Sequence, residues 1–215
     1  PKNDRGVLVR AVKFEIFPQG KDLETLLALS ANMCTVWNEG FAARDAVFQE
    51  HYAPLYNALK DAQSDDEKKQ IKRRLTKAFE EHAITAFDQI NGLTARRAGD
   101  QVFASVPRNW QEQTLVMLHG ATVSFLVLRK NGDKDARPPR ARLDTHFSEI
   151  YGRIGFKLED EGKKKVFTLR PGSVGAPMRF LLPEYQSSVL QGAEGKGGFA
   201  VKQFTLCRKP RDLSQ

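Results

Sequence analysis

The spacing of apolar residues changes twice along this chain, and that change constrains the fold more than any other feature. Val12, Phe14 and Ile16 alternate with polar residues, which is the period of a half-buried strand. From Asp22 the apolar residues recur every three or four positions, as in an amphipathic helix. After the Pro138-Pro139 pair the period returns to two. One strand, then helices, then several strands indicate an α+β fold.

The helical section is expected to span roughly 21–130. Its first helix carries apolar residues from Leu23 to Phe48, and we expect Pro54 to end it, because proline breaks helices. The second, 64–90, starts with the capping-box spacing of Ser64 and Glu67 and should end at Asn91-Gly92. The last helix follows Pro107, since proline is favoured in a first helical turn.

The strands lie on both sides of this section. The opening strand, Arg10–Phe17, cannot satisfy its backbone groups alone. We therefore expect it to pair with late strands: a hairpin around Glu161-Gly162, then Met178–Leu182 and Phe199–Leu206. The domains predicted are a first strand at 1–20, an inserted helical unit at 21–130 and the remaining strands at 131–215.

The chain is basic, with 34 Lys and Arg against 26 Asp and Glu and a formal net charge of +8. This balance favours a polyanionic partner, nucleic acid before a membrane surface. No apolar run is long enough to span a membrane and the first residues lack the apolar core of a signal peptide, so we expect a cytoplasmic protein without a membrane partner. Cys34 and Cys207 have no CxxC partner, which favours buried thiols over a disulfide or metal site.

The densest basic stretch is RKNGDKDARPPRAR at 129–142, with six cationic side chains and two carboxylates. Its two prolines stiffen an extended backbone, so the neighbouring arginines lose little entropy on docking, and arginine can bind phosphate with two hydrogen bonds. We predict a nucleic-acid contact through the following residues: Arg129, Lys130, Arg137, Arg140 and Arg142.

Other basic clusters are weaker candidates. The helix 64–90 carries Lys68, Lys69, Lys72 and Arg73, which fit a solvated helix face as well as a phosphate-binding one. Arg96 and Arg97 are expected in the loop after that helix, where they favour the phosphate-binding interpretation. Lys163, Lys164 and Lys165 lie at a hairpin tip or strand start, where lysines commonly protect a sheet edge.

No active site is predicted. The sequence contains none of GxxxxGK[ST], HExxH or GxSxG and no metal-ligand spacing of Cys and His, and its four histidines are scattered. Trp37, Asn38 and Arg44 lie on the first helix. On their own they fit a core tryptophan, a solvated asparagine and a surface charge.

With these elements in order, the chain resembles the N-terminal half of the TnpB and type V CRISPR effector family of RNA-guided nucleases. RAVKFEIFPQGKDLETLLALSANMCTVWNEGFAARD is similar to the family's opening strand and helix, with its aromatic-Asn pair at Trp37-Asn38 and an arginine at Arg44. TLVMLHGATVSFLVLRKNGDKDARPPRARLDTHFSEI resembles its helix and basic loop, although Arg-Pro-Pro-Arg replaces the usual Gly-Phe-Pro-Arg. AVKQFTLCRKP resembles a strand of its wedge domain.

The resemblance implies an oligonucleotide-binding-like β-barrel, the wedge domain, with an inserted helical recognition lobe. It implies binding of guide RNA, target DNA duplex and the RNA–DNA heteroduplex, with Trp37 and Asn38 near the target-adjacent duplex. The family cuts DNA with a RuvC-like domain that needs Mg²⁺, which we expect outside these residues. The chain is then either a fragment of a larger effector or a nuclease-less guide-binding protein, with a RuvC-like domain or a second copy as possible partner.

Two alternatives remain open at this point. One is a free-standing RNA-binding protein with the same β-barrel and helical insertion, which would bind structured RNA without a guide. The other is a helical protein-interaction module whose basic residues serve solubility, with exposed aromatic residues such as Phe48 or Phe125 on its surface.

Overall fold

The computed structural model describes residues 16–130, 133, 135–143, 149–161, 164–183 and 204–207, with the side chains of residues 129, 130, 149, 151, 164 and 207 left aside. Helices fill the first part: α1 (Gly20–Val47), the π-helix η1 (Phe48–Tyr52), α2 (Ala53–Asp61), α3 (Asp65–His82), α4 (Ala86–Gly99), α5 (Gln101–Ala104) and α6 (Arg108–Lys130). Strands follow: β1 (Glu149–Gly152), β2 (Phe156–Glu161), β3 (Lys164–Leu169), β4 (Met178–Leu181) and β5 (Phe204–Cys207), with a short 3-10 turn, η3 (Gly172–Val174), before β4. This is an α+β fold, as predicted.

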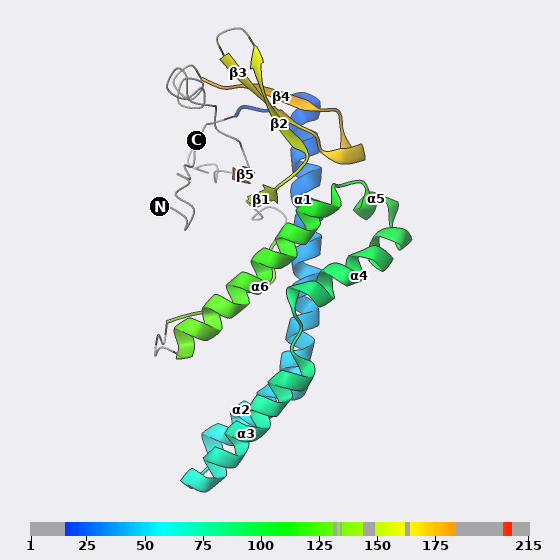
Figure 1. The fold of residues 1–215 in the computed structure, drawn as a ribbon. Helices are drawn as coiled ribbons and strands as arrows, with labels where there is room; N and C mark the ends of the chain where they lie inside the picture. Colours follow the sequence, from blue (N-terminus) through cyan, green and yellow to red (C-terminus); the bar gives the residue numbers. More distant parts are fainter. Residues whose placement is uncertain are drawn as a thin grey trace, which may run out of the picture.

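Helix α1 is the long axis of the molecule (Figure 1). The strands gather around its N-terminal end, the α2–α3 hairpin extends from its other end, and α6 crosses it between them. Gly40 permits a close approach at the crossing, because a Cβ there would lie 2.8 Å from Leu115 Cδ2 and 3.0 Å from Leu118 Cδ2.

Strands β2, β3 and β4 form one antiparallel sheet in that order, and β1 pairs antiparallel with β5. The predicted hairpin and the strand beginning at Met178 are therefore confirmed. Neither sheet closes within the described part of the chain, so no barrel is present there. The expected opening strand lies outside the described residues up to position 15, and Ile16 and Phe17 are not in a strand.

One core joins the helices to both sheets. Phe204 of β5 packs against Phe156 and Phe167 of the three-stranded sheet, with ring centroids 5.3 and 5.8 Å apart, and against Trp110 of α6 at 5.4 Å. Trp110 is fully buried, and its Nε1 donates to the Ile154 carbonyl at 2.9 Å. The α2–α3 hairpin has its own small core of Ala62, Ile71 and Leu75, separate from this one.

Two predicted helix ends were wrong. Pro54 lies in the first turn of α2, where a missing backbone N–H costs nothing, and the chain stays helical through η1 into α2. The helix from 65 ends at His82, and α4 continues through Asn91-Gly92. The Ser64 cap is confirmed, since its hydroxyl accepts from Glu67 N at 3.2 Å.

Candidate nucleic-acid interface

The proline loop, residues 135–143, is held against the middle of α1 by Trp37. The indole Nε1 donates to the Arg140 carbonyl at 2.8 Å, and the Arg142 guanidinium lies 4.0 Å from the ring centroid. Trp37 is only 2% exposed. Its ring is therefore committed to the protein interior and to Arg142, and it cannot serve as an open platform for a base.

Asn38 adds a second anchor to the same loop. Its Nδ2 donates to the Arg142 carbonyl at 2.7 Å, and its Oδ1 accepts from the Arg142 backbone N–H at 2.8 Å. The side-chain amide thus pairs with both backbone polar groups of one residue, as a neighbouring strand would. Since Pro138 and Pro139 donate no backbone hydrogen bond, such external partners keep the extended loop in place.

Two arginines of the loop are exposed to solvent, and a third packs against the protein. Arg137 and Arg140 are exposed, whereas Arg142 is half-buried over Trp37. At the loop start, Asp133 Oδ1 accepts from the N–H groups of Asp135 and Ala136 at 2.9 and 3.1 Å. Arg129 and Lys130 lie in the last turn of α6, with side chains outside the described set.

Arg44 lies between α1, α4 and α6. Its Nε donates to Gln89 Oε1 at 3.0 Å, and its second guanidinium nitrogen lies 3.4 Å from His119 Nδ1. Burial lowers the pKa of Arg44 from its ordinary value, and Asp88 partly offsets this effect. Burial, with the Arg44 charge, also lowers the pKa of His119. Arg44 thus links three helices.

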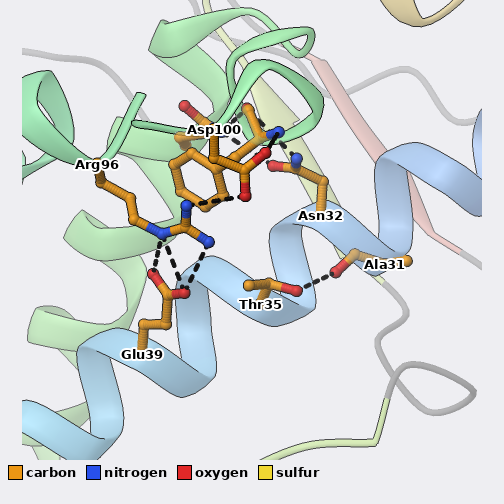
Figure 2. Close-up of polar contacts among 8 residues, drawn as sticks. Ala31, Asn32, Thr35, Glu39, Arg96 and Asp100 are labelled. Atoms are coloured by element: carbon orange, nitrogen blue, oxygen red, sulfur yellow. Dashed lines mark hydrogen bonds and ion pairs between the residues drawn. The ribbon is translucent and has the colours of Figure 1, made fainter. Parts of the chain in front are cut away.

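Arg96 and Arg97 were predicted in a loop but lie in the last turn of α4. Figure 2 shows Arg96 between two carboxylates: it donates to Glu39 at 3.1–3.2 Å and to Asp100 at 2.9 Å. Hydrogen bonds to Glu39 and Asp100 raise the pKa of Arg96. Its guanidinium also lies 4.3 Å above the Phe103 ring. Arg96 is therefore engaged in joining α1 to the start of α5.

Arg97 is engaged differently. It donates to the backbone carbonyls of Ala104 and Val106 at 2.8 and 2.9 Å and to Gln111 Oε1 at 2.5 Å. Burial, with the nearby Arg108, lowers the pKa of Arg97. None of its hydrogen-bond partners is a carboxylate. Sequence reasoning did not single out Glu39, Asp100 and Gln111, the partners of these two arginines. Glu39 and Gln111 lie on other helices, whereas Asp100 lies four positions after Arg96, a spacing that could have indicated the ion pair.

The α3 basic face, formed by Lys69, Lys72 and Arg73, is exposed on the side of the hairpin away from its small core. Within the described part of the chain, these three side chains make no hydrogen bond or ion pair, in contrast to Arg96. Lys68, from the same predicted cluster, is only partly exposed. Figure 1 places α3 at the end of the molecule opposite the sheets.

The last predicted cluster is only partly described. Lys163 lies outside the described residues, and of Lys164 only the backbone is described, as the first residue of β3. Lys165 Nζ pairs with Asp160 Oδ1 at 2.7 Å across the β2–β3 hairpin. Because β3 is the central strand of its sheet, Lys165 does not protect an edge, and the sheet-edge prediction is wrong for this residue; the lysine instead makes a cross-strand ion pair.

No protein-family model, curated protein or solved structure matches this chain. Within the described ranges, no group of three or more His, Cys, Asp or Glu side chains is placed to hold a metal ion. The described helices include none with the length and apolarity needed to cross a membrane.

Proposed function

We propose that this chain is the guide-RNA and target-DNA binding portion of an RNA-guided, DNA-targeting effector like those of the TnpB and type V CRISPR family. It acts in the cytoplasm. The nuclease chemistry, with its RuvC-like domain and Mg²⁺, belongs outside these residues. This portion binds nucleic acid and carries no catalytic group.

One observation carries the proposal: two of the three places that resemble the family touch each other. Trp37 and Asn38 are about 100 positions before Arg140 and Arg142, yet three hydrogen bonds and a cation–π contact join them. The contact fixes the course of the loop between the helical part and the strands. Arg137 and Arg140 are thereby presented on a stiff support, which suits binding to phosphates.

The fuller fold belongs to the same proposal. The core shared by the two sheets supports the proposal of a wedge barrel of the oligonucleotide-binding type. The helices of 20–130 then form the recognition lobe. In such effectors base pairing reads the sequence, so protein contacts to the heteroduplex are sequence-blind and weaken with salt.

The α3 basic face supplies the second contact in this arrangement. Its three cations are spaced so that one helix face carries them all, and they have no internal partner among the described residues. We propose that it follows the backbone of the heteroduplex. Arg96 and Arg97 are left out of the proposed interface, because Arg96 is hydrogen-bonded to two carboxylates and Arg97 donates to two backbone carbonyls and Gln111.

The double variant Arg137→Ala/Arg140→Ala tests the loop contact. Its RNA affinity should fall, and the slope of log affinity against log salt should become shallower by roughly 1.4, because about 0.7 is lost per phosphate contact to a single strand. The matched control Arg153→Ala/Arg179→Ala removes the same charge from two exposed positions, Arg153 between β1 and β2 and Arg179 on β4, where it pairs with Glu161 at 2.9 Å. Equal slopes for the two double variants would refute the loop contact.

A second candidate function, a helical protein-interaction module, is favoured by the surface of α6. Residues 113–128 contain no charged side chain, and Val123, Leu126 and Val127 are 42–50% exposed. An uncharged, partly apolar helix face suits a protein partner better than a nucleic acid. This candidate predicts no RNA binding at moderate salt, and a complex that survives nuclease treatment.

A further inference from the structure

A cleft of about 510 Å³ lies where the helices meet the strands. One wall is the α5–α6 connection, Ala104–Pro107, and the other is the segment around η3, from Arg170 to Pro177. In Figure 1, η3 is the short gold turn beside α5 and the start of α6. The volume falls within the range usual for small-molecule sites, about 300–1,000 Å³.

The two walls are locked together by the chain itself. The Ser105 carbonyl accepts from Ser173 N at 2.9 Å and from Ser173 Oγ at 3.2 Å. Gly172 has a φ of +78°, and a Cβ at this position would come within 2.5 Å of the Ser105 carbonyl oxygen. The cleft is therefore a fixed feature of the junction, formed before any ligand arrives.

Its lining is cationic and apolar. Arg97 and Arg170 line it, and no acidic side chain does. Neither arginine has a carboxylate hydrogen-bond partner among the described residues. Glu112 interacts electrostatically with Arg97, and Glu159 with Arg170, in both cases without a hydrogen bond. Glu112 already forms an ion pair with Arg108 at 2.8 Å. The cleft thus holds positive charge that the protein leaves without a bonded counter-charge.

The apolar part of the lining is rigid. Pro107, Pro177 and the buried Pro171 line it, and prolines have little conformational freedom to lose on binding. Guanidinium groups bind phosphate through paired hydrogen bonds, and apolar proline rings offer surface against which a planar ring can pack. A ligand that satisfies both features carries a phosphate and a planar ring.

We propose that this cleft is a nucleotide-binding site, in which Arg170 binds the phosphate, Arg97 adds positive charge from the wall where it is hydrogen-bonded, and the proline rings pack against the base. The phosphate reaches it either on a free mononucleotide or on the end of an oligonucleotide. The site is separate from the proline loop and the α3 basic face, and it needs no guide RNA.

The test uses the whole chain, purified free of nucleic acid at high salt, and isothermal titration with AMP and with adenosine. AMP should bind saturably and adenosine, which lacks the phosphate, should not. Arg170→Ala should weaken AMP binding at least about tenfold, the usual loss for a hydrogen bond to a charged group. The matched control Arg153→Ala, an exposed arginine outside the cleft, should change the affinity less than about twofold.

A competition arm identifies the source of the phosphate. Displacement of AMP by a 5′-phosphorylated oligoribonucleotide, and not by its 5′-hydroxyl form, assigns the site to a nucleic-acid end. No displacement assigns it to a free nucleotide, and either result supports the proposal. Absence of saturable AMP binding, equal binding of adenosine, or equal weakening by Arg170→Ala and Arg153→Ala would overturn it. Such a failure leaves the effect of Arg137 and Arg140 on RNA binding untouched, so it is distinguishable from failure of the proposed function.

Discussion

The proline loop and helix α3 carry similar densities of basic side chains but present them in opposite ways. The loop is anchored on buried Trp37, and that anchoring uses Arg142, so Arg137 and Arg140 are the described arginines left on display. Helix α3 rests on a small core, and its Lys69, Lys72 and Arg73 all face solvent. Charge density along a sequence therefore does not predict which cations are free to bind a partner, because residues on distant elements decide which cations are engaged within the protein.

The largest expected effect comes from breaking the loop's anchor. Trp37→Ala removes a side chain that is 2% exposed, together with the donor to the Arg140 carbonyl. We expect the free energy of unfolding to fall by about 3–5 kcal/mol, as for other large-to-small core changes. Urea unfolding measures it. Trp37→Phe keeps most of the packing and should cost less. A loss below about 1 kcal/mol for Trp37→Ala would mean that the loop does not depend on α1.

The next largest loss of stability is expected at the crossing of α1 and α6. Gly40→Ala places a methyl group 2.8 Å from Leu115 Cδ2, so we expect a loss of about 1–3 kcal/mol from overpacking. Gly92→Ala is the matched control. A Cβ at Gly92 meets nothing within 4 Å, and alanine should stabilise α4 by roughly 0.5–1 kcal/mol. Equal effects in thermal unfolding would show that the helices do not approach closely at Gly40.

A smaller effect follows from His119, which lies beside Arg44 at the same crossing. Burial and the Arg44 charge hold its folded-state pKa below the ordinary value of 6.5, so the unfolded chain binds its proton first as the pH falls. The free energy of unfolding therefore falls as the pH drops from about 6.5 to the folded-state pKa of His119. Above about pH 6.5 this imidazole has no effect on it. Free energies of unfolding between pH 5 and 8 should show a shallower pH dependence for His119→Gln. Identical curves would contradict the burial of this imidazole.

The smallest stability effect is expected on the α3 basic face. The triple variant Lys69→Ala/Lys72→Ala/Arg73→Ala removes exposed side chains without internal partners in the described structure, so its stability should stay within about 0.5 kcal/mol of the parent. Its affinity for an RNA–DNA heteroduplex should nevertheless fall, with a salt slope shallower by roughly 2–3. The control triple Lys21→Ala/Lys60→Ala/Arg153→Ala changes the same charge elsewhere. An equal loss of affinity in both triple variants would mean that net charge, and not a contact made by the α3 basic face, causes the effect.

Much of the fold could be predicted from local patterns. The Ser64 cap and the helix after Pro107 each depend on residues close in sequence, and both are present, although Glu67 accepts from Gln63 N and so does not complete the capping box. The error at Asn91-Gly92 has a local cause as well. Thr85 and Asp88 form a complete capping box, which starts α4 only a few residues earlier and carries the helix through the glycine. The T-x-x-D spacing, taken as a helix start, would have predicted the break between α3 and α4 correctly.

The candidate interface could be predicted only in part, because its decisive contacts join distant residues. No residue near Arg96 in the sequence indicates that Glu39, 57 positions away, is its partner. Likewise, the role of Asn38 depends on Arg142, 104 positions along the chain. Sequence patterns found the basic residues but could not distinguish structural cations from exposed ones.

The most direct test of the proposed function is to purify the chain without nuclease, sequence any bound RNA, and measure retention of a DNA duplex that matches it. We expect one discrete RNA species, and retention of the matched duplex that is lost after RNase treatment. Protein that binds neither RNA nor duplex at ~0.15 M salt would contradict RNA-guided recognition and would favour a protein partner on the uncharged face of α6.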